Sequence, residues 1–125
     1  MKRKNTIAGL ITLFVFILAT SNSFANKTSV KITAPEKAEK GTEITVKIEV
    51  NHMGNSSSHH TDWVWIKVNG EEIKKWEYTK KSLPENQTFI LEFKIKAEAT
   101  LEISAEGHCN RHGSKGEDKV TVQVE

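Results

Sequence analysis

The sequence predicts an all-β fold, a seven-stranded antiparallel immunoglobulin-like β-sandwich. Apolar and polar residues alternate in most segments after residue 25, as they do in half-buried strands. Turn-forming residues separate these segments at short intervals, and Asn69-Gly70 is a strong signal for a β-hairpin. Short strands that follow one another with such turns are typical of sandwiches of this class.

The first 25 residues have the layout of a secretory signal peptide. Residues 2–4 are basic, residues 7–19 form an apolar run, and residues 23–25 include small side chains suited to a cleavage position. The run is shorter than the roughly 20 apolar residues that span a bilayer, so we expect cleavage after Ala25 and no stable membrane anchor. Residues 26–125 then form one domain, exported to the periplasm or the extracellular space.

The expected strands follow in order along this domain. Residues 43–51 carry the clearest alternation, and residues 89–95 repeat it. Residues 63–66 are apolar on both faces, as in a central strand, and Asn69-Gly70 joins that strand to the next. The seven expected strands are 29–33, 43–51, 61–68, 72–78, 87–96, 100–107 and 118–125, with polar turns at 35–41, 54–58 and 83–86.

Charge excludes one class of partner. The chain has 18 Lys and Arg, and the three in residues 2–4 leave 15 after cleavage, against 16 Asp and Glu, for a net charge of −1. A nucleic-acid-binding domain usually carries a concentrated basic patch, so we expect no nucleic-acid partner. These patterns leave the oligomeric state open, and a homo-oligomer is compatible with them.

The single cysteine, Cys109, is unusual for an exported protein, because export compartments are oxidising and structural cysteines there are normally paired. An inert buried thiol, an intermolecular disulfide and a metal-bound thiolate are all open at this point. All five histidines lie in two clusters. His52, His59 and His60 bracket one loop, and His108 and His112 flank the cysteine.

Strand register places members of both clusters at the rim of the predicted interior. His52 continues the apolar face of residues 44–50, and Cys109 has the parity of residues 101–105. Cys109 and His112 converge only if the chain turns between them, which Asn110 and Gly113 permit. One thiolate with several imidazoles suits iron, copper or zinc better than calcium or magnesium.

The cysteine and most of the histidines lie in two segments, "HMGNSSSHHTDWVWI" and "CNRHG". In their order and spacing, these segments resemble those of the superoxide reductase family, which comprises the neelaredoxins and the iron-binding domain of the desulfoferrodoxins. The resemblance implies an immunoglobulin-like domain with mononuclear iron, cycling between Fe2+ and Fe3+. Such proteins, which serve in oxidative stress, are oxidoreductases that reduce superoxide by one electron to hydrogen peroxide. They draw electrons from a donor such as a rubredoxin-like protein or another small redox protein. Matched by position, the metal ligands are His52, His59, Cys109 and His112, and His60 and His108 are not ligands.

The start of the first strand departs from the family pattern. The family has Glu-Lys-His there, which supplies a fourth imidazole, a lysine that attracts superoxide and a glutamate that binds the resting iron. This chain has Lys27-Thr28-Ser29 instead, so the histidine and the glutamate are missing. Lys27 and Lys31 are the candidates for the positive charge at the catalytic centre.

Two other function classes fit parts of the sequence. One is a cupredoxin-like copper protein, or a zinc-binding or electron-transfer protein without superoxide reductase turnover, which would also use Cys-x-x-His. In a blue-copper site a methionine, the weak axial ligand, usually follows the second histidine, but no methionine follows His112. A plain binding module would use Trp63, Trp65 and Trp76 as a ligand surface, although tryptophans in sandwiches more often pack inside.

Overall fold

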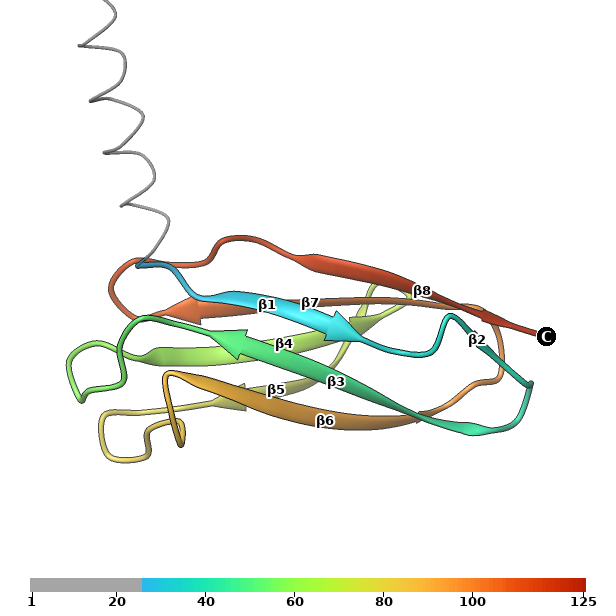
Figure 1. Cartoon of the computed structure of the whole chain (residues 1–125), viewed down its shortest axis with the longest axis horizontal. Coiled ribbons are helices and arrows are strands. Elements are labelled where there is room, and N and C mark those ends of the chain that lie inside the picture. Colours follow the sequence, from blue (N-terminus) through green and yellow to red (C-terminus); the bar gives the residue numbers. More distant parts are fainter. Residues whose placement is uncertain (1–25) are drawn as a thin grey trace, which may run out of the picture.

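The structure, a computed structural model, describes residues 26–125, and within this range it contains eight strands and no helix (Figure 1). The predicted signal peptide, residues 1–25, lies outside the described residues. No helix in the described part is long and apolar enough to cross a membrane. The strands are β1 (Ser29–Thr33), β2 (Lys37–Ala38), β3 (Glu43–Asn51), β4 (Thr61–Val68), β5 (Glu71–Glu77), β6 (Thr88–Lys96), β7 (Leu101–Cys109) and β8 (Asp118–Val124).

The strands form two sheets. One has the order β1-β3-β6 and the other β2-β8-β7-β4-β5. Neighbouring strands are antiparallel except β2, which pairs in parallel with β8. The all-β prediction is confirmed. The predicted count of seven strands was wrong because β2 is an eighth strand, and the predicted wholly antiparallel arrangement was wrong because β2 is parallel to β8. β2 lies inside the polar turn expected at residues 35–41, where two residues pair with distant Gln123 and Val124 and leave no periodic signal.

The core lies between the sheets, because the apolar face of each strand turns toward the other sheet. β3 alternates regularly, with Ile44, Val46, Ile48 and Val50 buried and the residues between them exposed. Val64 and Ile66 of β4, and Ile103 and Ala105 of β7, meet them from the five-stranded sheet. The alternation seen in the sequence therefore predicts the core directly.

The hairpin signal at Asn69-Gly70 is also confirmed. Asn69 has φ 51° and Gly70 has φ 84°, which are the positive values that a tight turn between β4 and β5 requires. Asn69 also ties the turn to β7, because its side-chain oxygen accepts a hydrogen bond from the Glu102 amide at 2.9 Å.

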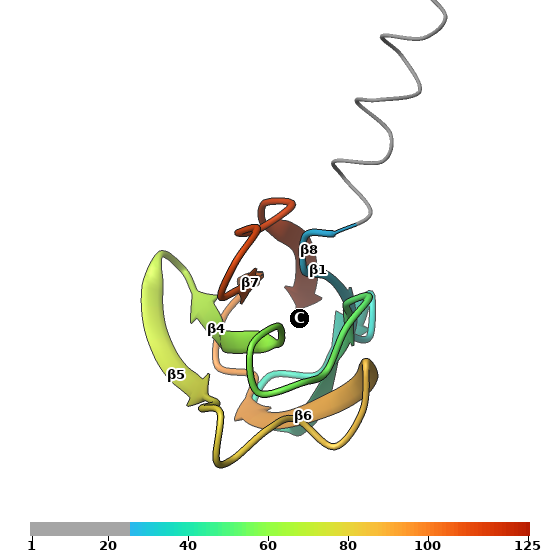
Figure 2. The same cartoon turned by 90° about the vertical axis from the view of Figure 1, so that its left-hand side faces the viewer.

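One end of the sandwich gathers segments that are distant in sequence. They are the start of the described chain before β1 and the loops from β3 to β4, from β5 to β6 and from β7 to β8, whereas the C-terminus lies at the opposite end (Figure 1). Figure 2 views this end directly and shows the loop after β3, drawn in green, crossing the end of the sandwich. One histidine cluster of the sequence lies in the loop between β3 and β4, and the other spans the end of β7 and the loop that follows it.

Candidate metal centre

Three side chains converge at this end of the fold. His52, His59 and Cys109 each offer one ligand atom, and these three atoms lie within 4.8 Å of one another. His52 directly follows β3 and is 5% exposed, and Cys109 ends β7 and is fully buried. Both therefore keep the inward direction that strand register predicts, and the loop between β3 and β4 brings His59 to them.

His112 joins this group at its edge. Its Nδ1 lies 3.1 Å from His59 Nε2 and 3.9 Å from Cys109 Sγ. The turn that returns His112 toward Cys109 is closed by two backbone hydrogen bonds between Cys109 and Gly113, at 2.9 and 3.0 Å. Gly113 has φ 82°, a conformation that favours glycine. The expected turn is confirmed, and the four predicted ligands lie together.

His52 has one ring nitrogen that finds no partner within the described part of the chain. Its Nδ1 lies 2.7 Å from the Gly54 carbonyl oxygen, which can only accept, so Nδ1 carries the proton. In the neutral ring Nε2 is then the acceptor nitrogen, and it is buried with no hydrogen-bond partner among residues 26–125. A buried polar atom without a partner is costly in a folded protein. A buried imidazole nitrogen in a cluster with a thiol and other imidazoles fits a metal ion of the iron, copper or zinc group.

The thiol lies in a nest of backbone donors. The amide groups of Arg111 and His112 approach Cys109 Sγ at 3.5 and 3.4 Å. Donors that point at sulfur stabilise the thiolate, which is the form that binds metal. This turn therefore directs two backbone donors at Cys109 Sγ, which the His112 ring also borders through its Nδ1 at 3.9 Å.

The electrostatic surroundings favour a neutral ring at His59. Partial burial, followed by the neighbouring His52, His112, Arg111 and His60, lowers the pKa of His59 below its usual value. A neutral imidazole is the form that binds metal. Two further rings contact it edge-on, with centroids of His52 at 4.7 Å and of His112 at 4.9 Å.

The other two histidines are held by partners outside this group. His60 is buried, and its Nδ1 donates to the Ser56 carbonyl oxygen at 2.9 Å, which closes the loop that carries His59. His108 lies on the outer face of the sheet, where its Nδ1 is 2.7 Å from Asp62 Oδ1 and its ring stacks on Trp63. Neither belongs to the group of three ligand atoms.

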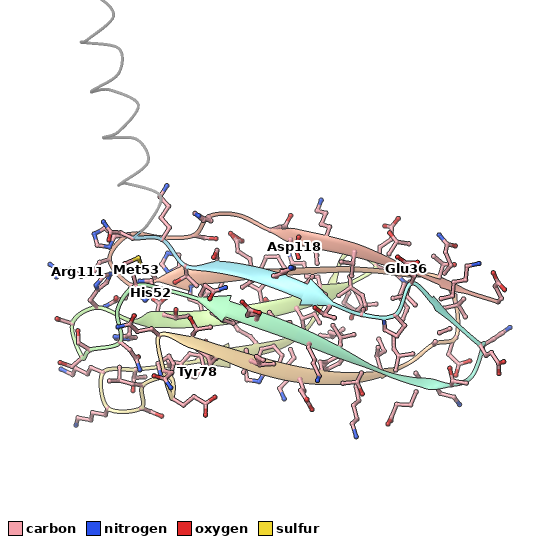
Figure 3. The ribbon with its side chains drawn as sticks, viewed as in Figure 1. Glu36, His52, Met53, Tyr78, Arg111 and Asp118 are labelled. Carbon is pink, nitrogen blue, oxygen red and sulfur yellow. The ribbon has the colours of Figure 1, made fainter. Side chains whose placement is uncertain are left out.

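The lysines predicted at the catalytic centre lie in different places. Lys27 lines a hollow of about 300 Å³ that adjoins the site, whereas Lys31 is exposed on β1 opposite Glu49 and does not line it. Lys115, which was not predicted from the sequence, follows the cysteine loop and lines the same hollow. The lining residues are Lys27, Ser29, Asn51, His52, Met53, Gln87, Thr88 and Lys115. Figure 3 shows His52 and Met53 at this end of the molecule, near Arg111.

The segment that departs from the family pattern contributes no imidazole. Thr28 is fully buried, and its hydroxyl hydrogen-bonds to the Thr61 hydroxyl at 3.0 Å. Ser29 pairs with Asn51 in the sheet. The hydroxyl pair therefore occupies interior space beside the thiol, since Thr61 is also the register partner of Cys109.

The tryptophans are mostly packing residues. Trp65 is 8% exposed, and Trp76 packs against the core. Lysine ammonium groups cover their rings, with Lys67 at 4.3 Å from the Trp65 centroid and Lys74 at 4.9 Å from that of Trp76. This covering leaves little open aromatic surface of the kind that a plain binding module would use.

Comparison with known proteins supports the resemblance seen in the sequence. A sequence model of the desulfoferrodoxin family matches residues 20–116, most of the chain. The chain belongs to the desulfoferrodoxin family. A search of curated proteins finds no match.

Solved structures show the same fold as this desulfoferrodoxin family member. The superoxide reductase (neelaredoxin) from Ignicoccus hospitalis is similar with a TM-score of 0.68 at 23% identity, over 82% of this chain and 85% of that chain. The CARDB domain of the PF1109 protein from Pyrococcus furiosus, solved in complex with di-metal ions, is similar with a TM-score of 0.58 at 17% identity, over 78% and 87% of the two chains. The chain therefore has a superoxide reductase-like fold, and it carries a candidate His/Cys site at one end of that fold.

Proposed function

We propose that this chain is an exported mononuclear iron protein that reduces superoxide by one electron to hydrogen peroxide. One observation carries the proposal: one ligand atom each of His52, His59 and Cys109, the only cysteine of the sequence, lies within 4.8 Å of the others, and the buried Nε2 of His52 has no hydrogen-bond partner in the described part of the chain. Membership of the desulfoferrodoxin family supports iron as that ion.

The hydrogen bonds around the four predicted ligands indicate how each one would bind the ion. His52 would bind through Nε2, because Nδ1 is engaged with Gly54. His59 and His112 share a hydrogen bond, which an ion between their nitrogens would replace. Cys109 would bind as a thiolate supported by two backbone donors. Three imidazoles and one thiolate are therefore the ligands, and the fourth imidazole of the family is absent because Thr28 and Ser29 occupy that segment.

When bound, iron would supply one-electron redox chemistry: superoxide would take one electron from iron(II) and two protons from water to give hydrogen peroxide, and a reduced small redox protein would return the electron to iron(III). The chain itself provides attraction for the anion. Lys27 and Lys115 flank the hollow beside His52 and give it positive charge. Such steering raises the rate of encounter with a small anion and weakens as salt screens it. Lys31 contributes less, because it lies outside the hollow.

The layout of residues 1–25 supports export. In an exported protein, a bound metal would also protect the thiol of Cys109. In an oxidising compartment a free thiol forms disulfides or is oxidised further. Cys109 is fully buried, and an ion bound at Sγ would occupy the one atom that could react. The unpaired cysteine and the predicted export are therefore compatible.

The yield of peroxide tests the proposed reaction. The iron-loaded protein, given superoxide and a one-electron donor, should form one hydrogen peroxide per superoxide consumed and release no oxygen. Spontaneous dismutation gives half that yield together with oxygen, so a yield at that level, equal to that of the metal-free protein, would contradict reductase activity. A preference for zinc, or an intense blue band with copper, would favour the two other metal functions.

A further inference from the structure

Asn110 connects the two loops that carry the candidate ligands. It directly follows Cys109 and makes three hydrogen bonds to the loop between β3 and β4. Its backbone N–H donates to the His60 carbonyl oxygen at 3.1 Å, and its side-chain Oδ1 accepts from the His60 amide at 3.0 Å. Its side-chain Nδ2 donates to the Ser58 carbonyl oxygen at 3.2 Å.

These bonds fall on both sides of His59. Ser58 precedes it, His60 follows it, and both are held by the same side chain. His59 is fixed within its own loop as well, since its backbone pairs with Ser56 in both directions, at 2.9 and 3.2 Å. Asn110, which is adjacent to one ligand and holds both neighbours of the other, therefore ties the His59 segment directly to Cys109.

We propose that Asn110 is a positioning residue that sets the distance between the His59 and Cys109 ligands of the metal site. This inference rests on the proposed function, because it assumes that both residues bind one ion. Groups that orient metal ligands contribute strongly to metal affinity, and losing one typically costs about 10- to 100-fold. Asn110 is solvent-exposed, so its hydrogen bonds add little to folding stability, and their main effect is on geometry.

Asn69, at the opposite end of the sandwich, provides a matched control for the Asn110 substitutions. Asn69 makes the same pair of bonds with Glu102 that Asn110 makes with His60: its N–H donates to the carbonyl oxygen at 2.9 Å, and its Oδ1 accepts from the amide at 2.9 Å. Asn69 lies in the β4–β5 hairpin, remote from the ligands. Asn69→Ala removes a similar hydrogen bond, and its positive φ makes the substitution costlier for the fold.

Titration with cobalt(II), followed by the thiolate-to-metal absorption band, tests the assignment. Asn110→Ala should bind cobalt about 10- to 100-fold more weakly and shift or broaden the band. Asn110→Asp, which keeps the Oδ1 acceptor but loses the Nδ2 donor, should fall between Asn110→Ala and the unsubstituted protein. Asn69→Ala should lower the unfolding midpoint yet keep the cobalt affinity and the band.

The outcomes separate the two proposals. No thiolate band in the unsubstituted protein overturns the metal site and, with it, the role of Asn110. A band that Asn110→Ala reproduces at equal affinity overturns the positioning role alone. Equal losses of affinity in Asn110→Ala and Asn69→Ala also overturn it, because general destabilisation would then explain both.

Discussion

At the scale of single residues, Gly54 makes room for one ligand. A Cβ atom at this position would lie 2.8 Å from His59 Nδ1 and 3.1 Å from its Cε1. The clash involves a side-chain ring, which can swing away without unfolding the loop. The absence of a side chain at residue 54 therefore matters for where His59 lies and much less for folding.

Gly54→Ala should weaken metal binding by about tenfold or more, because the displaced His59 ring no longer meets Cys109, while the unfolding midpoint of the metal-free protein changes little. Metal titration together with denaturant unfolding checks both parts. Ser57→Ala, an exposed substitution in the same loop, serves as the control. Unchanged affinity in Gly54→Ala would show that the site tolerates a moved ring or does not use His59.

The protonation of His59 gives a prediction about pH. Because burial and its charged neighbours lower the pKa of His59, the folded protein releases this proton more readily than the unfolded chain does. Stability from this group is complete above the ordinary histidine pKa and falls as pH drops from there through the lower pKa of the folded state. An NMR titration of the metal-free protein should give His59 a midpoint below that of a histidine in a short peptide. A midpoint at or above the peptide value would contradict this account.

At the scale of strands, Gly107 of β7 allows β1 to approach. A Cβ atom there would lie 2.8 Å from Thr28 Cγ2 and 3.1 Å from Val30 Cγ1. This contact positions the start of β1 and the buried Thr28–Thr61 hydroxyl pair next to the cysteine strand. The close approach of β1 to β7 thus builds the interior wall of the site.

Gly107→Ala should lower the free energy of unfolding by about 1–3 kcal/mol, since the added methyl overpacks the contact between β7 and β1. Denaturant unfolding measures the change, with Glu106→Ala on the outer face of the same strand as the control. If Gly107→Ala unfolds at the same midpoint as the unsubstituted protein, the two strands are less tightly packed than the structure indicates.

Strand-level predictions from sequence succeeded where the signal was local. The alternation in residues 43–51 and the Asn69-Gly70 turn fix β3 and the β4–β5 hairpin. The end of β7 was predicted two residues early, because pairing with Thr61 and Trp63 of β4 extends the strand to Cys109 through a register shift. Such pairing depends on a distant partner and leaves no mark in the periodicity of β7 itself.

At the scale of the whole molecule, the site exists because the fold brings two loops to one end. Strand parity predicted that His52 and Cys109 point inward, and the cysteine motif predicted the turn to His112. The hydrogen bonds of Asn110, the burial of Thr28 and the contribution of Lys115 to the hollow were not predicted. Each of these depends on contacts between distant segments, which a single sequence does not reveal.

The visible spectrum of the oxidised, iron-loaded protein reports directly on whether Cys109 and the histidines hold one iron ion. The unsubstituted protein should bind one iron per chain and show a thiolate-to-iron(III) charge-transfer band. Cys109→Ala should lose this band, and a histidine substitution such as His52→Ala should lower the iron content. An unchanged spectrum in Cys109→Ala, or a protein that binds only zinc at stoichiometric amounts, would contradict the account.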